Sequence, residues 1–353
     1  MSNKKRVYII GAGASQEAGL PTGEGLKDVI ANILTLKETN TYAYTFRDRD
    51  MLFAIEQHIK QNDVFSKNKS HYYKAAELIT NAIPQAISID HLIHSHNGNK
   101  DVELCGKLAI VKAILESEKN SSLYINDSNN NRMNFGEIKD TWYNLFWKLL
   151  HENCDINHFS ERLKSIVFII FNYDRCVEHF LFNSIQNFYN VSQDIAADLL
   201  KNIEIYHPYG VVGNLRWQDG NYVDFGTFPH TDSFLSVASR IKTFTEGTVP
   251  DSSEILAIRK HIATATQLVF LGFAFHPLNL ELLFLKEPVK PTGKVPINVF
   301  GTGKGQSESN SLIICDNLRD SLLAYNYKPV FNLQNNFKCH ELFIEYSKML
   351  SFA

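Results

Sequence analysis

The chain has 353 residues, 44% of them hydrophobic, and its 35 basic and 38 acidic residues give a formal net charge of −3. This length and composition suffice for a large buried core in one to three domains, while the near-neutral charge provides no field that attracts nucleic acid or an anionic membrane surface. Five scattered cysteines without a Cys-x-x-Cys pair argue against a disulfide framework and a structural zinc, and the apolar runs are too short to span a bilayer, so we expect a cytoplasmic protein.

The first predicted element is a buried strand over residues 7–10, which are apolar and mostly β-branched. Gly11 and Gly13 follow it, and glycines at this spacing allow a tight turn whose backbone N–H groups approach a ligand closely. Ser15 is placed to cap a helix that starts after the turn. Because unpaired N–H groups and the helix dipole attract negative charge, a strand, a glycine turn and a helix N-terminus together predict a pyrophosphate site.

The dinucleotide fingerprint Gly-x-Gly-x-x-Gly is incomplete, because Gln16 stands at the position of its third glycine. This mismatch argues against an ordinary nicotinamide-dependent dehydrogenase, and a glycine turn without any ligand stays open as the plain structural alternative. Residues 19–22, Gly-Leu-Pro-Thr, end the first helix, and Thr22 is placed to cap a second helix that runs through residues 26–30.

The string Gly-Ala-Gly-x-Ser-x-x-x-Gly-Leu-Pro-Thr over residues 11–22 resembles the opening of the sirtuins, in which a glycine turn and a small loop wrap NAD. It is most similar to the bacterial SIR2-like branch. The protein-deacylating sirtuins continue with Asp-Phe-Arg after the proline and carry a four-cysteine zinc module, and this chain has neither. The resemblance implies a Rossmann-like parallel sheet that binds NAD through Gly11, Ala12, Gly13, Ser15, Pro21 and Thr22.

From about residue 27 to residue 163 the chain lacks clear strands and shows helical periodicities separated by polar breaks. We interpret residues 29–163 as a helical insertion, and residues 1–28 together with 164–353 as a Rossmann-like NAD-binding domain. Three histidines within residues 91–96 lack a spacing that completes a metal site, so we expect no metal. Residues 88–90, Ser-Ile-Asp, resemble a string of the SIR2-like branch, but a helix N-cap explains them equally well.

The second informative stretch is the apolar run of residues 166–171, which predicts a strand buried on both faces. Asn172 and Asp174 follow it at the strand end where open α/β sheets bind ligands. The string Phe-Asn-Tyr-Asp resembles the SIR2-like motif and implies that Asn172 holds a water and the nicotinamide ribose, while Asp174 positions the nicotinamide end. The alternatives are a turn asparagine and an aspartate that caps the next helix.

Residues 202–210 read as a short strand ended by proline and glycine, which places His207 at another strand end. In sirtuin-like enzymes a histidine directly before the glycine is the general base, but here Tyr209 takes that position. In extended backbone, residues two apart face the same side, and a histidine titrates nearer neutral pH than a tyrosine. The resemblance therefore implies His207 as the base and Tyr209 as an NAD contact, with a structural histidine as the alternative.

The remaining predicted elements continue the sheet. Residues 213–228 are predicted to form a loop or hairpin with Trp217 and Tyr222 as lid aromatics. The apolar residues from Leu268 predict a buried strand with a glycine at its end, followed by a helix that begins near Pro277. The resemblance here implies NAD contacts from Gly272, Phe273 and Asn279.

The last predicted strand covers residues 295–300 and is followed by a glycine turn that starts at Gly301. By the same resemblance Gly301 packs against adenosine. The tail, residues 331–352, is aromatic-rich and is predicted to close the domain with a helix.

Taken together, the motifs imply an NAD⁺ glycohydrolase that uses NAD as its substrate, needs no metal, and releases nicotinamide and ADP-ribose. The resemblance also implies a role in bacterial anti-phage defence by NAD depletion, as a homo-oligomer or beside a partner such as an ATPase, with no direct contact to nucleic acid or membrane. Three alternatives remain at this point: a catalytically silent NAD- or ADP-ribose-binding scaffold subunit, an NAD-dependent protein deacylase and a dehydrogenase.

Overall fold

The computed structural model describes residues 5–40, 43–62, 68–126, 132–220, 222–243, 252–285 and 295–352. Within these ranges a six-stranded sheet runs in the order β5-β4-β1-β6-β7-β8, and every neighbouring pair is parallel. The strands are β1 (Lys5–Ile10), β4 (Ile166–Ile170), β5 (Glu204–Tyr206), β6 (Ala265–Leu271), β7 (Val295–Thr302) and β8 (Tyr327–Gln334). Counted along the chain, this order is 3-2-1-4-5-6, the order of dinucleotide-binding Rossmann folds. The predicted Rossmann-like α/β class is confirmed.

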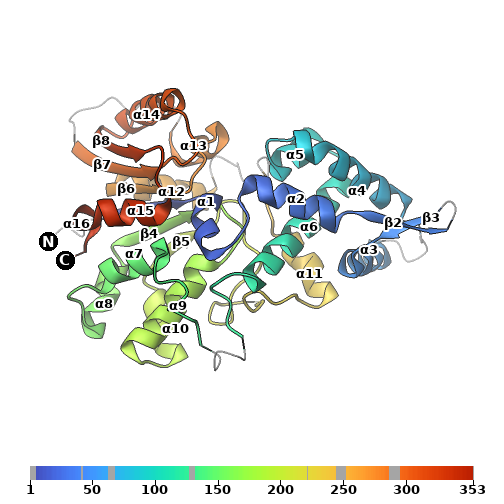
Figure 1. The fold of residues 1–353 in the computed structure, drawn as a ribbon, viewed down its shortest axis with the longest axis horizontal. Helices are drawn as coiled ribbons and strands as arrows, with labels where there is room; N and C mark the ends of the chain where they lie inside the picture. Colours follow the sequence, from blue (N-terminus) through green and yellow to red (C-terminus); the bar gives the residue numbers. More distant parts are fainter. Residues whose placement is uncertain are drawn as a thin grey trace.

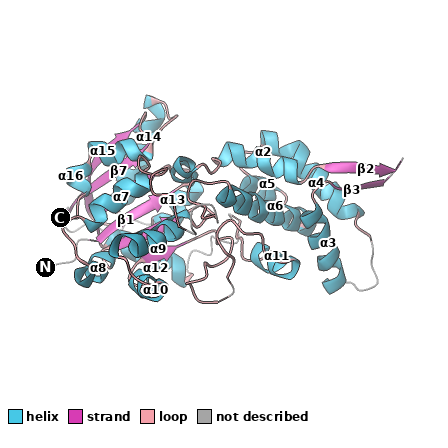
Figure 2. Cartoon of the chain, turned by 60° about the horizontal axis from the view of Figure 1, so that its bottom comes forward, coloured by secondary structure: helices cyan, strands magenta, loops and turns pink. Residues whose placement is uncertain are grey.

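Side chains of the central strand β1 alternate between two cores, because successive residues of a strand point to opposite faces. Val7 and Ile9 belong to one core, Tyr8 and Ile10 to the other, and all four are essentially inaccessible to solvent. The second core is covered by α7 (Trp142–His151), α8 (Ile156–Leu163), α9 (Cys176–Tyr189), α10 (Gln193–Leu200) and α15 (Cys339–Glu345). The first is covered by α12 (Ser253–Ala263), α13 (Pro277–Leu283) and α14 (Glu308–Leu323), so helices flank both faces of the sheet (Figure 2).

A helical lobe extends away from the sheet (Figure 1). It contains α2 (Gly23–Ile33), α3 (Arg49–Asn62), α4 (Ser70–Ala82), α5 (Ile89–Ser95) and α6 (Lys100–Lys119). The long helix α6 is buried along most of its length and packs against α2 and α4. A further helix, α11 (Thr231–Ala238), comes from the chain after β5 and crosses over to pack on α3 and α6. The lobe is therefore built from two separate parts of the sequence.

The segment expected to be a strand-free insertion differs from that expectation in two ways. It contains an antiparallel hairpin of β2 (Leu36–Asn40) and β3 (Ala43–Phe46), where threonine and tyrosine favour extended backbone. Helices α7 and α8 also pack on the sheet and not on the helical lobe, since the Phe146 ring lies 5.2 Å from Tyr8 and 5.7 Å from Phe168. Helical periodicity indicated helices in this segment, but it does not identify the surface against which a helix packs.

Strand β6 ends at Leu271, as the glycine after it predicted, because Gly272 adopts a left-handed φ of 55° and turns the chain. The next two strands differ from the prediction. Strand β7 continues through Thr302, so Gly301 lies within a strand and not in the expected turn. Strand β8 was not predicted, since this edge strand is mostly half-buried or exposed and includes Pro329.

The first and last described segments lie close together (Figure 1), and Arg6 connects them. Its guanidinium donates to the carbonyl oxygens of Leu350 at 2.8 Å and Ser351 at 2.6 Å and lies over the Phe352 ring. The predicted closing helix is present as α15 and the short α16 (Ser347–Leu350). Among the described residues, no helix has the length and apolar character needed to cross a bilayer.

Candidate functional site

A cavity of about 810 Å³ opens at the carboxyl edge of the sheet. The loops that follow β1, β4, β5, β6 and β7 meet there with α5 of the helical lobe. This edge includes the point between β1 and β6 where the strand order reverses, which is where open α/β sheets bind ligands. Of the residues expected to contact NAD or act on it, nine line the cavity: Gly11, Ala12, Gly13, Thr22, Asn172, Tyr209, Gly272, Phe273 and Asn279.

The glycine turn after β1 is pressed against the loop after β6. The Gly11 N–H donates to the Leu271 carbonyl at 2.9 Å, and the Gly13 N–H donates to the Gly272 carbonyl at 3.0 Å. A Cβ on Gly11 would lie 2.5 Å from the Gly272 oxygen, and one on Gly272 would lie 2.1 Å from the Ala14 nitrogen. The glycines are therefore required by the contact between two backbones. Two N–H groups expected to face a pyrophosphate are already bonded.

Ser15 was expected to cap a helix, and this expectation is wrong. Helix α1 (Ala12–Ser15) begins three residues earlier, and the Ser15 side chain makes no cap bond. Its hydroxyl donates to Asp174 Oδ2 at 2.8 Å and accepts from Asn172 Nδ2 at 3.1 Å, and all three residues are buried. Ser15 and Asp174 therefore lie behind Asn172 and hold its amide toward the cavity.

Asp174 makes a second hydrogen bond, which agrees with the alternative interpretation of this residue as a helix cap. Its Oδ1 accepts from the N–H of Cys176, the first residue of α9, at 3.1 Å. The carboxylate thus satisfies a free donor at the start of that helix, as a cap does. Asp174 does not line the cavity, and its two oxygens bond to Ser15 and Cys176.

His207 lies one layer below the cavity and does not line it. Its Nε2 is 2.7 Å from Oε1 of Glu178 on α9, and its Nδ1 is 3.2 Å from the main-chain oxygen of Asn172. Burial lowers the pKa of His207, but the Glu178 carboxylate outweighs that effect and the pKa is raised. Both partners are acceptors, and the raised pKa favours the protonated ring, whose two nitrogens are both engaged. It supports Asn172 from behind and does not present a free basic nitrogen to a ligand.

Aromatic rings form one wall of the cavity. The Tyr209 hydroxyl donates to Asn279 Oδ1 at 2.6 Å, and burial raises the Tyr209 pKa. The Phe171 ring makes edge contacts with Tyr209 at 5.7 Å and Phe273 at 5.1 Å between centroids. Nearby Phe275 has a φ of 54°, which is strained for a bulky side chain and is a feature that concentrates at functional sites.

Asp90 lines the cavity and was not among the expected site residues. It lies in the first turn of α5, and the Tyr173 hydroxyl donates to its Oδ1. Burial raises the pKa of Asp90 to about 6, although the bond from Tyr173 opposes that shift. Ser88 caps α5 by accepting from the His91 N–H at 3.1 Å, as the cap interpretation predicted. The Ser-Ile-Asp string was the sequence signal that pointed to Asp90.

Two further predicted contacts lie outside the cavity lining. Pro21 precedes α2 and lies beside Gly25 in the first turn of that helix. Gly301 lies inside β7. A Cβ on Gly301 would lie 2.3 Å from the Leu333 side chain, so strand packing explains this glycine. The residues after Gly301 reach the cavity instead, since Thr302 and Lys304 line it.

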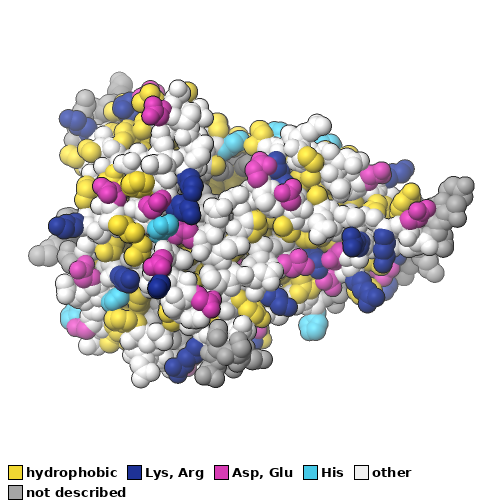
Figure 3. Space-filling model, viewed as in Figure 1, with side chains coloured by type: hydrophobic (Ala, Val, Ile, Leu, Met, Phe, Trp, Pro, Cys, Tyr) yellow, Lys and Arg dark blue, Asp and Glu magenta, His cyan; other side chains and the backbone are white. Residues whose placement is uncertain are grey.

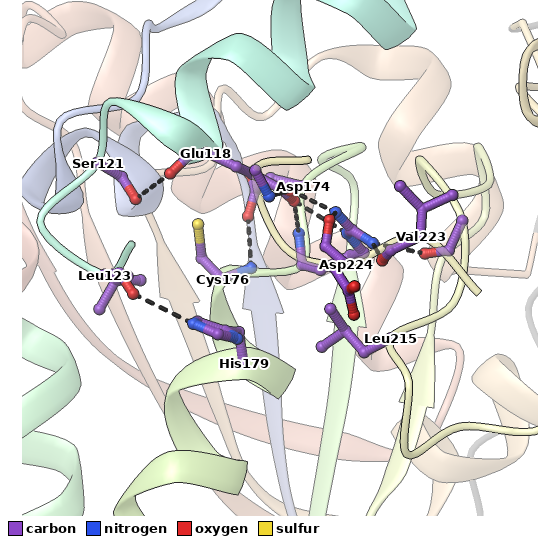
Figure 4. A network of polar contacts seen from close by, with 12 residues as sticks. Glu118, Ser121, Leu123, Asp174, Cys176, His179, Leu215, Val223 and Asp224 are labelled. Atoms are coloured by element: carbon purple, nitrogen blue, oxygen red, sulfur yellow. Dashed lines mark hydrogen bonds and ion pairs between the residues drawn. The ribbon is translucent and has the colours of Figure 1, made fainter. Parts of the chain in front are cut away.

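A buried ion pair anchors the loop that carries Asn172 and Asp174 (Figure 4). Arg175 Nε donates to Glu118 Oε1 at 3.0 Å, and the two side chains are 1% and 0% exposed. Arg175 also donates to the main-chain oxygens of Val223 and Asp224. The pair thus joins the end of α6, the loop after β4 and the segment of residues 213–228.

Trp217 lines a second cavity, of about 670 Å³, between that segment and α9 and α10. Its ring stacks on Phe182 with centroids 5.3 Å apart. Tyr222 is 53% exposed, with the Arg216 guanidinium over its ring. Neither aromatic lines the first cavity, so the expectation that they form its lid is wrong.

Metal-ligating side chains and surface charge bear on which ligands the first cavity can bind. In the described ranges no group of three or more His, Cys, Asp or Glu side chains is placed to hold a metal ion. The face seen in Figure 3 carries acidic and basic side chains interspersed, without a broad patch of one sign.

Comparison with protein-family models found no match to this chain, and comparison with curated protein sequences also found none.

Proposed function

We propose that this chain is an NAD⁺ glycohydrolase of the SIR2-like kind. The observation that carries the proposal is the side-chain amide of Asn172, held by Ser15 and lining the cavity at the reversal point of a Rossmann-ordered sheet. A volume of about 810 Å³ is in the range of small-molecule and cofactor sites, roughly 300–1,000 Å³. The resemblance of the residues around Gly11 and Asn172 to the SIR2-like motifs supplies the specific reaction.

The reaction breaks the bond between the ribose C1 and the nicotinamide nitrogen. The bonding electron pair leaves with nicotinamide, the ribose becomes oxocarbenium-like, and a water oxygen bonds to C1 while its proton is released. Asn172 orients that water and the ribose hydroxyls, and the rings of Phe171, Tyr209 and Phe273 limit access of other water. The products are nicotinamide, ADP-ribose and one proton.

His207 receives a different role from the one that the resemblance implies. Its two ring nitrogens are engaged with Glu178 and the Asn172 main chain, so the proposal treats it as a positioning residue. A protonated ring at this place pairs with the Glu178 carboxylate and donates to the Asn172 main-chain oxygen, which fixes the Asn172 backbone. The general base must then be another group.

The proposed biological role follows from the same resemblance. Depletion of cytoplasmic NAD during phage infection would be the output. The isolated chain would be poorly active, and it would assemble as a homo-oligomer or with a partner such as an ATPase. Light scattering combined with an activity titration over protein concentration tests this part. A fully active monomer at low concentration would contradict it.

A second candidate function is a catalytically silent subunit that binds NAD or ADP-ribose. It is favoured by one observation: the expected basic histidine is bonded on both nitrogens below the cavity. Such a subunit would bind ADP-ribose and release no nicotinamide.

The test is incubation of the purified protein with NAD⁺, followed by chromatography of the products. The proposal expects nicotinamide and ADP-ribose in equal amounts, without an acylated peptide and without absorbance of the reduced cofactor. Asn172→Ala should abolish the release, while Asn187→Ala, an exposed change on α9, should retain it. Turnover that requires an acetylated peptide would establish the deacylase instead. Binding without turnover would establish the silent subunit.

A further inference from the structure

The helical lobe brings one acidic side chain to the sheet edge. Asp90, in the first turn of α5, lines the cavity and accepts a hydrogen bond from the Tyr173 hydroxyl. Asp90 of the helical lobe and Asn172 of the sheet edge both line the cavity, and Tyr173 directly follows Asn172 in the chain. Nothing in the local sequence of either segment pairs these two residues.

Two other titratable groups that border the cavity, Glu17 and His276, are already used by the fold. Glu17 accepts through Oε2 from the Trp142 N–H at 2.8 Å and through Oε1 from the His340 N–H at 2.9 Å, which fixes the starts of α7 and α15. His276 accepts through Nδ1 from the N–H of Leu278 as the cap of α13. Of the two carboxylates among the described lining residues, Glu17 holds the starts of two distant helices, whereas Asp90 accepts from the Tyr173 hydroxyl.

We propose that Asp90 is the general base of the NAD hydrolysis proposed above, on which this inference rests. Asp90 takes a proton from the water that Asn172 orients, and the water oxygen bonds to the ribose C1. As that bond forms, the bond from C1 to the nicotinamide nitrogen breaks and its electron pair leaves with nicotinamide. The proton then passes from Asp90 to solvent. An ionised carboxylate at this place also stabilises the positive charge that develops on the ribose.

The protonation state of Asp90 fits this role. Burial raises the pKa of Asp90 to about 6, so the carboxyl group is mostly ionised at neutral pH. Its pKa is also close enough to neutral pH for the group to accept and return a proton. The groups that face it are the Tyr173 and Tyr209 hydroxyls from the sheet loops, and its charge contributes to the raised Tyr209 pKa after burial. His91 of α5 and His276 of α13 lie close to each other near Asp90. Burial lowers the pKa of His276, and the proximity of His91 lowers it further. Lys304 and Lys338 line the same cavity from the loops after β7 and β8.

The first arm of the test compares Asp90→Asn with the wild type and with Asp28→Asn, a matched change at an exposed position of α2. Loss of a positioned base lowers kcat by roughly 10²- to 10⁴-fold. The KM for NAD⁺, the Kd for ADP-ribose and the melting temperature should stay near the wild-type values. Asp28→Asn should hydrolyse NAD⁺ like the wild type.

The second arm measures kcat as a function of pH, because this pH profile would not depend on Asp90 if the residue had only a structural role. The wild-type kcat should fall as pH drops through about 6, since protonation removes the base. Tyr173→Phe removes the hydrogen bond that lowers the Asp90 pKa, so the acid limb should move to higher pH. This arm remains decisive if Asp90→Asn does not fold.

The outcomes separate the two proposals. An active wild type with a wild-type kcat in Asp90→Asn, or with an unmoved acid limb in Tyr173→Phe, overturns Asp90 as the base and leaves NAD hydrolysis standing. A wild type that releases no nicotinamide overturns the hydrolysis itself, and the assignment of Asp90 falls with it. Loss of turnover in Asp90→Asn with retained ADP-ribose binding, together with the upward shift, establishes the base.

Discussion

The Asn172 side-chain amide donates to the Ser15 hydroxyl at 3.1 Å, and the two residues are 157 positions apart in the chain. This bond joins the loop after β1 to the loop after β4, and Asp174 extends it at 2.8 Å from Ser15. The three side chains form a buried polar group directly behind the cavity. The orientation of the Asn172 amide is thus set from the interior of the sheet edge.

Ser15→Ala should lower both stability and activity. The substitution leaves Asp174 Oδ2 and Asn172 Nδ2 buried without this partner, which costs about 1–3 kcal/mol. The amide of Asn172 then loses its fixed orientation, so nicotinamide release should fall. Urea unfolding and product chromatography measure the two effects. Ser253→Ala, at an exposed position of α12, is the matched control, and equal stability of the two variants would contradict the prediction.

The pair of His207 and Glu178 should make stability depend on pH. The His207 pKa is raised in the folded state, so the pair contributes stability below the unfolded value of about 6.5 and loses it as pH rises through the folded value. Urea unfolding of the wild type and His207→Gln should therefore show the larger difference at pH 6 and the smaller one at pH 9. A difference that grows with pH would mean that His207 is neutral in the fold.

Gly272→Ala should be strongly destabilising. A Cβ at this position would lie 2.1 Å from the Ala14 nitrogen, and the φ of 55° disfavours any L side chain, so the two loops that form the cavity must separate. Gly23→Ala is the matched control, because its Cβ would meet nothing within 4 Å and alanine suits the first turn of α2. Thermal unfolding of both variants measures the contrast. Similar melting temperatures would show that the loops part easily.

The Arg175–Glu118 pair should be essential to the fold. Glu118→Gln removes one partner and leaves a buried guanidinium charge uncompensated, for which a loss of about 3–5 kcal/mol is expected. Asp224→Asn is the comparison, since it breaks the exposed pair with Arg216 and should change stability little. Denaturant midpoints measure the difference. A small effect of Glu118→Gln would mean that water reaches the Arg175 guanidinium.

The residue pattern alone predicted the class of fold and the edge of the sheet where the site lies. Consecutive apolar residues such as 166–170 predict a strand that is buried on both faces, and glycine or asparagine directly after such strands predicts their carboxyl ends. In a parallel sheet all these ends share one edge. Gly11, Asn172 and Gly272 therefore met at one cavity, as their positions after strands implied. Strand β8 was missed because its half-exposed edge lacks a continuous apolar run.

The tertiary structure alone decided which side chains face the cavity. His207 was expected there by its place at a strand end, but Glu178 on α9 holds it below the surface. Asp90 reaches the cavity because α5 of the helical lobe packs over the sheet edge. Periodicity and turn residues report the conformation of neighbouring residues in the chain. Hydrogen bonds and burial depend on residues brought together from distant segments, and their pairing is set by how whole helices and strands pack.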